Sequence, residues 1–176
     1  HYFSLRFRGL KVATGCRTVE KGWYTPMTPH EAADFEADKL TFMRAHAGPD
    51  AWIMLDGHMG NSPGQTWTVE IAIAVAKALE PFNLFFFEEP LHYTDPWGYA
   101  ELCKATSVPI AGGECLTAMY EWQVFAKQDS FDIGQPDASF TGGMGEVMAV
   151  AKLMADRGRK IATHAWGAGG SLMQNI

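Results

Sequence analysis

Short apolar runs alternate with longer segments of helical periodicity along the chain. The runs have strand length and contain many branched and aromatic residues, whereas the longer segments repeat apolar residues every three or four positions. The expected strands are residues 5–13, 52–55, 84–87, 108–111, 131–133 and 160–162. The expected helices are residues 29–46, 67–79, 97–105, 118–127 and 143–157. This alternation predicts an α/β fold with a parallel sheet, either a barrel or an open doubly wound sheet.

The first expected helix has clear boundary signals. Thr28 is a suitable N-cap, Pro29 suits the first helical position, and Glu31 completes a capping box. Gly48 and Pro49 are expected to end this helix.

Composition narrows the classes of partner. The chain has 176 residues, enough for one domain, and 47% hydrophobic with 19% charged residues is typical of a soluble globular protein. With 20 acidic and 14 basic residues and no basic patch, we expect neither nucleic acid nor a membrane surface as partner. The strongest apolar stretch, residues 84–87, is far too short to cross a bilayer. An anionic substrate stays compatible, because a bound divalent metal reverses the local charge.

The three cysteines are far apart in the sequence. Cys16, Cys103 and Cys115 form no C-x-x-C pair, and their number is odd. Free thiols in a reducing compartment are therefore expected, which favours a cytoplasmic location.

Five polar residues follow successive expected strands at intervals of 32, 26, 23 and 27 residues. They are Asp56, Glu88, Glu114, Asp137 and His164. In a parallel barrel all strands point the same way, so these side chains would converge on the face where barrel active sites lie. Three carboxylates from consecutive strands form a set of hard oxygen ligands that suits Mg²⁺, and without a cation they would repel one another.

Each of these residues alone has a plainer interpretation. Asp56 with Gly57 is compatible with a simple turn, the acid before Pro90 with a loop cap, and His164 with a hydrogen-bonded buried histidine. The ordered set is harder to explain in that way, and it favours a functional site.

Several motifs identify a family. Phe87-Glu88-Glu89-Pro90, residues 109–114, Gln135-Pro136-Asp137 and Gly142-Gly143 resemble the mandelate racemase branch of the enolase superfamily. The resemblance implies a modified (β/α)8 barrel of the TIM type, a Mg²⁺ cofactor, and removal of the proton α to a substrate carboxylate. It also implies residue roles. The metal ligands would be Asp56, Glu88 and Glu114, the base would be His164, and Asp137 would orient that base.

Two departures from the family pattern narrow the expected reaction. Many members have Lys-x-Lys on an early strand, whereas this chain has Lys11-Val12-Ala13, so the second basic lysine is absent and a two-base racemase is not expected. Asp56-Gly57-His58 resembles the galactonate dehydratase type, in which this histidine is the general acid for a leaving hydroxyl. His58 is also compatible with a solvated loop residue. One base, one metal and one acid are what β-elimination of water from a sugar acid requires.

Other positions have two interpretations. Lys11 would contact the substrate carboxylate or be a surface lysine at a strand end, and Trp166 would line the pocket or serve packing. Glu89 is expected to be a structural acid rather than a ligand. An epimerase, racemase or cycloisomerase on the same scaffold, or a non-catalytic fragment, are the alternative functions.

The resemblance covers nearly the whole chain and identifies the expected strands as about the second to the seventh of an eight-stranded barrel. Residues 1–176 are therefore expected to be an incomplete catalytic barrel, without the N-terminal capping domain and the final strand. We expect the complete protein to be a homo-oligomer that acts on a small carboxylate.

Overall fold

The computed structural model describes residues 6–14, 27–60 and 66–176. Over these residues, six parallel strands pair in the order in which they follow one another along the chain. They are β1 (Gly9–Ala13), β2 (Trp52–Asp56), β3 (Phe86–Glu88), β4 (Ile110–Gly112), β5 (Ile133–Gly134) and β6 (Lys160–Ile161). A doubly wound sheet reverses its strand order at a switch point, whereas this sheet continues in one direction, as in a barrel.

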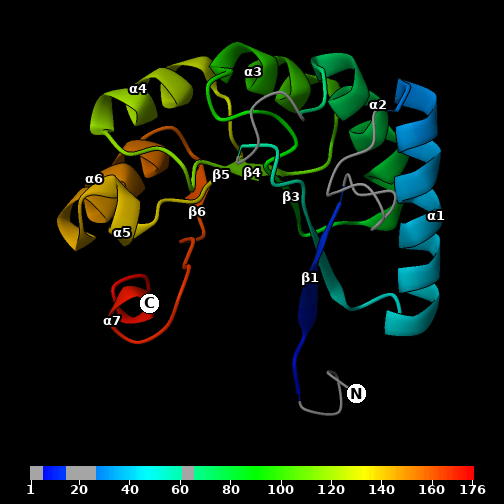
Figure 1. Cartoon of the computed structure of the whole chain (residues 1–176), viewed down its shortest axis with the longest axis horizontal. Coiled ribbons are helices and arrows are strands. Elements are labelled where there is room, and N and C mark those ends of the chain that lie inside the picture. Colours follow the sequence, from blue (N-terminus) through cyan, green and yellow to red (C-terminus); the bar gives the residue numbers. More distant parts are fainter. Residues whose placement is uncertain (1–5, 15–26, 61–65) are drawn as a thin grey trace.

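The long helices form an arc around one side of the strands (Figure 1). They are α1 (Pro29–Ala47), α2 (Val69–Leu79), α3 (Pro96–Ala105), α4 (Met119–Gln128) and α6 (Met144–Ala155). These correspond to the five expected helices, with boundaries that differ by up to two residues. The capping box of α1 is present, because the Glu31 N–H donates to Thr28 Oγ1 at 3.3 Å and the Thr28 N–H donates to Glu31 Oε2 at 2.9 Å.

Three short elements were not predicted from the sequence. They are the 3₁₀ turn η2 (Glu80–Phe82), α5 (Ala138–Thr141) and α7 (Gly170–Met173). Each has three or four residues, too few to show a helical repeat of apolar positions. The periodicity of apolar positions therefore gives no signal for α5 or α7.

Alternation along the strands separates two apolar clusters. Ile53 and Leu55 belong to the main core between the sheet and the helices, whereas Met54 packs on a smaller cluster around Phe86. Asp56 lies two residues after Met54, and Glu88 lies two residues after Phe86. Because side chains alternate between the two faces of a strand, both acids lie on the inner side, away from the helices.

None of the helices in the described part of the chain combines the length and the apolarity that a membrane span requires.

Candidate active site

The first two predicted metal ligands are neighbours on adjacent strands. Asp56 and Glu88 are direct partners in the parallel register of β2 and β3, and both are buried. Lys11, from β1, lies between them, with its Nζ 2.6 Å from Asp56 Oδ2 and 2.7 Å from Glu88 Oε2. Lys11 is therefore part of the carboxylate cluster and not a separate surface lysine.

The electrostatics of this cluster indicate an excess of negative charge. Burial and the neighbouring Asp56 carboxylate raise the pKa of Glu88, even though Lys11 opposes that shift. Burial disfavours the ammonium of Lys11, but the carboxylates of Glu88 and Asp56 outweigh it and raise the pKa of Lys11. The ammonium of Lys11 thus lies between Asp56 and Glu88, but its single positive charge does not neutralise the two carboxylates. Their buried, hard oxygen donors fit a divalent cation such as Mg²⁺.

The predicted base and its partner form a second group. His164 Nδ1 lies 2.8 Å from Asp137 Oδ2, and His164 Nε2 lies 3.2 Å from Glu114 Oε2. The third predicted ligand therefore contacts the predicted base. Burial of Asp137 opposes its ionisation, but the N–H of Ser139, together with His164 and Asn175, lowers the pKa of Asp137. An ionised Asp137 holds a proton on Nδ1 of the imidazole, which leaves Nε2 as the atom available to exchange a proton.

His58 lies at the start of the segment that leaves β2. Its Nδ1 is 3.0 Å from Asp56 Oδ1, and its backbone N–H donates to the same oxygen at 3.2 Å. The side chain is 54% exposed, and the φ angle of +49° is uncommon for a residue with a side chain. This compact turn keeps the imidazole beside the carboxylate cluster while leaving it accessible.

Glu89 is buried beneath the segment that carries His58. The Met59 N–H donates to the Glu89 carbonyl at 3.1 Å, and a Cβ on Gly60 would lie 2.6 Å from the Glu89 carboxylate. Burial, followed by the charges of Glu114 and Asp56, raises the pKa of Glu89 to about 9. Burial thus favours the protonated form of Glu89.

One candidate set of ligand atoms combines Glu89 with Glu114 and Cys115, which lie within 4.8 Å of one another among the described residues. Burial, Glu89 and Glu114 raise the pKa of the Cys115 thiol to about 12. A thiol is a soft ligand that suits Mg²⁺ poorly, so this set fits the predicted cation less well than the oxygen donors of Asp56, Glu88 and Glu114.

A cavity of about 410 Å³ opens beside these groups, within the size range of small-molecule sites. Its lining residues are His58, Glu114, Cys115, Phe140, His164 and Trp166. Trp166 is 63% exposed and lines this cavity rather than the core. The two predicted catalytic histidines therefore share one cavity with Glu114 and Trp166.

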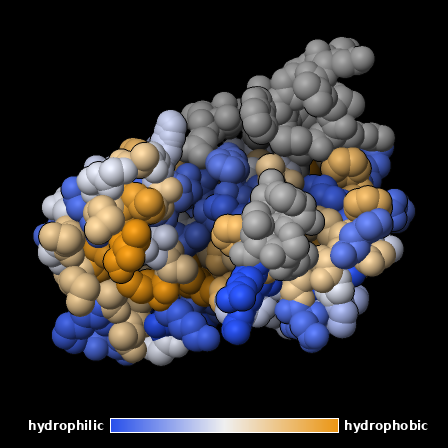
Figure 2. All heavy atoms as spheres, turned by 90° about the horizontal axis from the view of Figure 1, so that it is seen from below, coloured by the Kyte–Doolittle hydropathy of each residue, from blue (hydrophilic) through white to orange (hydrophobic). Residues whose placement is uncertain are grey.

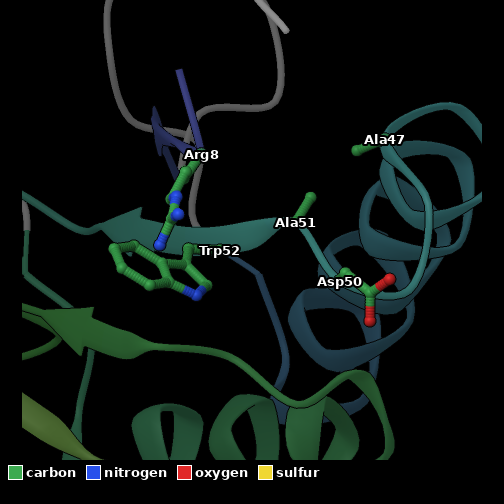
Figure 3. A pocket seen from close by; sticks show the side chains of 5 residues that line it. All are labelled: Arg8, Ala47, Asp50, Ala51 and Trp52. Carbon is green, nitrogen blue, oxygen red and sulfur yellow. The ribbon is translucent and has the colours of Figure 1, made fainter. Parts of the chain in front are cut away.

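A second cavity, of about 480 Å³, lies near the start of β2 (Figure 3). It is lined by Arg8, Ala47, Asp50, Ala51 and Trp52. Trp52 begins the strand that Asp56 ends, so this cavity lies at the opposite end of the strand from the acidic cluster. It contains none of the predicted site residues.

Sequence reasoning missed one buried residue of the site. Asn175, after α7, donates from Nδ2 to Asp137 Oδ1 at 3.0 Å. Its sequence position, 11 residues beyond His164, follows no strand or motif that could have singled it out. Lys11 was identified as a candidate, but its position between Asp56 and Glu88 was not predicted.

Comparison with known proteins identifies the family of this chain. The family described as Enolase C-terminal domain-like matches residues 4–176. An L-talarate/galactarate dehydratase of Salmonella typhimurium is 36% identical over 126 residues, which cover 72% of this chain and 30% of that protein. A 3,6-anhydro-α-L-galactonate cycloisomerase of Streptomyces coelicolor is 32% identical over 129 residues, which cover 73% of this chain and 34% of that protein.

A crystal structure of L-talarate dehydratase from a Polaromonas species, complexed with Mg and L-glucarate, has a similar fold. The TM-score is 0.77 at 28% identity, and the match covers 94% of this chain and 41% of the other. The chain thus spans less than half the length of these relatives. The family match extends over nearly all of the sequence, so the chain belongs to the enolase C-terminal domain-like family, and the enolase superfamily and barrel-type fold expected from the sequence are confirmed.

Proposed function

We propose that this chain forms part of the catalytic barrel of a Mg²⁺-dependent sugar acid dehydratase, acting on an aldonate or an aldarate. The observation that carries the proposal is the shared cavity, in which the Asp137-linked imidazole of His164 and the accessible imidazole of His58 lie beside Glu114. Two histidines in one cavity supply a base and an acid, which elimination of water requires.

The metal-binding residues in this proposal are Asp56, Glu88 and Glu114. The raised pKa of Glu88 and the lysine ammonium already present between two of these acids support a site that attracts cations. When bound there, Mg²⁺ would stabilise the negative charge that develops on the substrate carboxylate after the α-proton is removed.

The reaction divides among the chain's own residues. His164 takes the proton from C2 at Nε2, while Asp137 fixes the opposite ring nitrogen. The electron pair of the broken C–H bond then forms the C2–C3 double bond as the 3-hydroxyl leaves. His58 donates the proton that releases this hydroxyl as water. The enol product converts to a 2-keto-3-deoxy acid.

The remaining site residues hold the substrate. We infer that Lys11 directs its ammonium to the substrate carboxylate, and that a cation held by Asp56 and Glu88 would take its place beside these two acids. Trp166 provides an apolar wall for the carbon chain of the substrate. Membership of this family and the cavity size support a small-molecule substrate.

The thiols of Cys103 and Cys115 support a cytoplasmic location, whereas Cys16 lies outside the described residues.

A cycloisomerase is the second candidate, because the Streptomyces relative with that activity is nearly as similar as the dehydratase. Product analysis separates the two functions. A dehydratase yields a product lighter than its substrate by one water, whereas a cycloisomerase retains all atoms of its substrate, so the mass of the product decides between them.

The decisive variant is His58→Asn in the complete protein, assayed on a sugar acid and on its 3-fluoro analogue. Fluoride leaves with little protonation, so we expect the variant to release fluoride near the wild-type rate but to lose water about 10²–10⁴-fold more slowly. His30→Asn, on the exposed face of α1, is the matched control and should change neither rate. An equal loss with both substrates would mean that His58 shapes the site and is not the acid.

A further inference from the structure

Asn175 is buried where the chain returns after α7, with 7% of its surface exposed. Both polar atoms of its side-chain amide form hydrogen bonds. Nδ2 donates to Asp137 Oδ1 at 3.0 Å, and Oδ1 accepts the backbone N–H of Ala138 at 2.9 Å. Because one contact needs a donor and the other an acceptor, the amide has a single satisfied orientation.

The contact with Asn175 determines how Asp137 meets the imidazole. Asp137 Oδ1 accepts from Asn175 and, at 2.7 Å, from the backbone N–H of Ser139. The other oxygen, Oδ2, is the one that pairs with His164 Nδ1 at 2.8 Å. Two donors on one oxygen restrict rotation of the carboxylate, so the direction of Oδ2 is fixed.

The same segment also holds the strand end that carries His164. The hydroxyl of Thr163, the preceding residue, donates to the Asn175 backbone carbonyl at 2.5 Å. Asn175 thus joins the end of β5, which carries Asp137, to the end of β6, which carries His164. A displacement of either side chain would break at least one of these bonds.

We propose that Asn175 is a positioning residue that sets the orientation of the Asp137–His164 pair. The catalytic part of this inference rests on the proposed role of His164 as the base. The positioning itself is a property of the hydrogen bonds of the chain and can be measured without turnover.

The test uses Asn175→Asp in the complete protein, with Gln174→Glu as the control. The first variant keeps the size of the side chain and an acceptor for Ala138 but removes the donor to Asp137. Gln174→Glu introduces the same negative charge one residue earlier, at an exposed position. The first readout is the NMR resonance of the His164 Nδ1 proton, assigned by its loss in His164→Asn. The second is the rate of α-proton exchange, with kcat and KM measured separately.

We expect Asn175→Asp to shift or broaden the Nδ1 resonance and to lower kcat for exchange about 10- to 100-fold with little change in KM. Gln174→Glu should match wild type in both readouts. A folded Asn175→Asp protein with a wild-type Nδ1 resonance and exchange rate would overturn the proposal.

A milder variant keeps the inference testable if Asn175→Asp does not fold. Thr163→Val removes only the hydroxyl that holds the Asn175 carbonyl, and it should shift the same resonance and slow exchange to a smaller extent. A folded Thr163→Val protein with an unchanged resonance would overturn the proposal as well. Failure of the proposed function is a separate result, namely exchange that persists in His164→Asn, and the resonance still decides the role of Asn175 in that case.

Discussion

At the scale of single residues, the sequence predicted the positions of the candidate side chains better than it predicted their contacts. The positions of Asp56, Glu88 and His164 follow from strand ends, since every strand of a parallel barrel delivers its last residues to one face. The contact of His164 with Glu114 depends on side-chain conformations, which no periodicity encodes. Asn175 was missed because its role depends on a chain reversal through α7.

His164→Asn in the complete protein tests the base directly. Asparagine keeps a polar group near Asp137 but cannot accept a proton at catalytic pH. We therefore expect exchange of the substrate α-proton with solvent deuterium to fall about 10²–10⁴-fold. Deuterium incorporation followed by NMR measures it.

The control for this variant is His46→Asn, which changes an exposed histidine near the end of α1. It should exchange the α-proton at the wild-type rate. Exchange that continued undiminished in His164→Asn would place the base on another residue.

At the scale of elements, the apolar periodicity predicted all five long helices, and the boundary residues explain why. Thr28 caps α1, while Asp95 accepts the Gly98 N–H at the start of α3. The short α5 was missed, although its N-cap is Asp137 itself, whose carboxylate accepts from Ser139. Asp137 is both the N-cap of α5 and the partner of His164, and the sequence predicted only the second of these roles.

The segment that follows β2 depends on a glycine. A Cβ added to Gly57 would lie 2.5 Å from the carbonyl oxygen of Glu89, which belongs to the backbone after β3. Gly57→Ala should therefore push the end of β2 away from β3 and destabilise the protein by about 1–3 kcal/mol. It should also weaken Mg²⁺ binding, since Asp56 and Glu88 flank the contact. Urea unfolding and a metal titration measure the two effects.

The matched control for Gly57→Ala is Gly145→Ala on α6, where an added Cβ would meet no atom within 4 Å. Alanine favours a helix over glycine by up to about 1 kcal/mol, so this variant should be neutral or slightly more stable. If the two variants unfolded at the same urea concentration, the close approach of Gly57 to Glu89 would not determine the stability of the protein.

At the scale of the whole molecule, the order of strands was the most informative prediction. The resemblance to an eight-stranded barrel implied consecutive parallel strands, and the sheet runs from β1 to β6 in that order. The outer surface was less predictable. Figure 2 shows apolar surface gathered on the side where Figure 1 places α5, α6 and α7. The large exposed apolar side chains of α5, α6 and α7 include Phe140, Met144, Met148 and Leu172. Exposure of this kind depends on which elements lie alongside, which local periodicity does not determine.

Metal binding should be visible as a change in the stability of the complete protein. A ligand that binds only the folded state stabilises it by about 2.7 kcal/mol at a concentration of 100 times Kd. The Tm should therefore rise when Mg²⁺ replaces EDTA. In Glu88→Gln this rise should largely disappear, because a neutral amide is a poor Mg²⁺ ligand.

The same variant should behave differently without metal. The raised pKa of Glu88 means that the folded protein disfavours its ionised form, through burial and the Asp56 carboxylate. Replacing the charge by an amide removes this penalty, so in EDTA the Tm of Glu88→Gln should equal or exceed that of wild type. Glu101→Gln makes the same substitution at an exposed site on α3 and should retain the full response to Mg²⁺. A Glu88→Gln protein that still gained the wild-type increment from Mg²⁺ would show that the cation binds elsewhere. A lower Tm in EDTA would instead show that the bond to Lys11 outweighs the repulsion from Asp56.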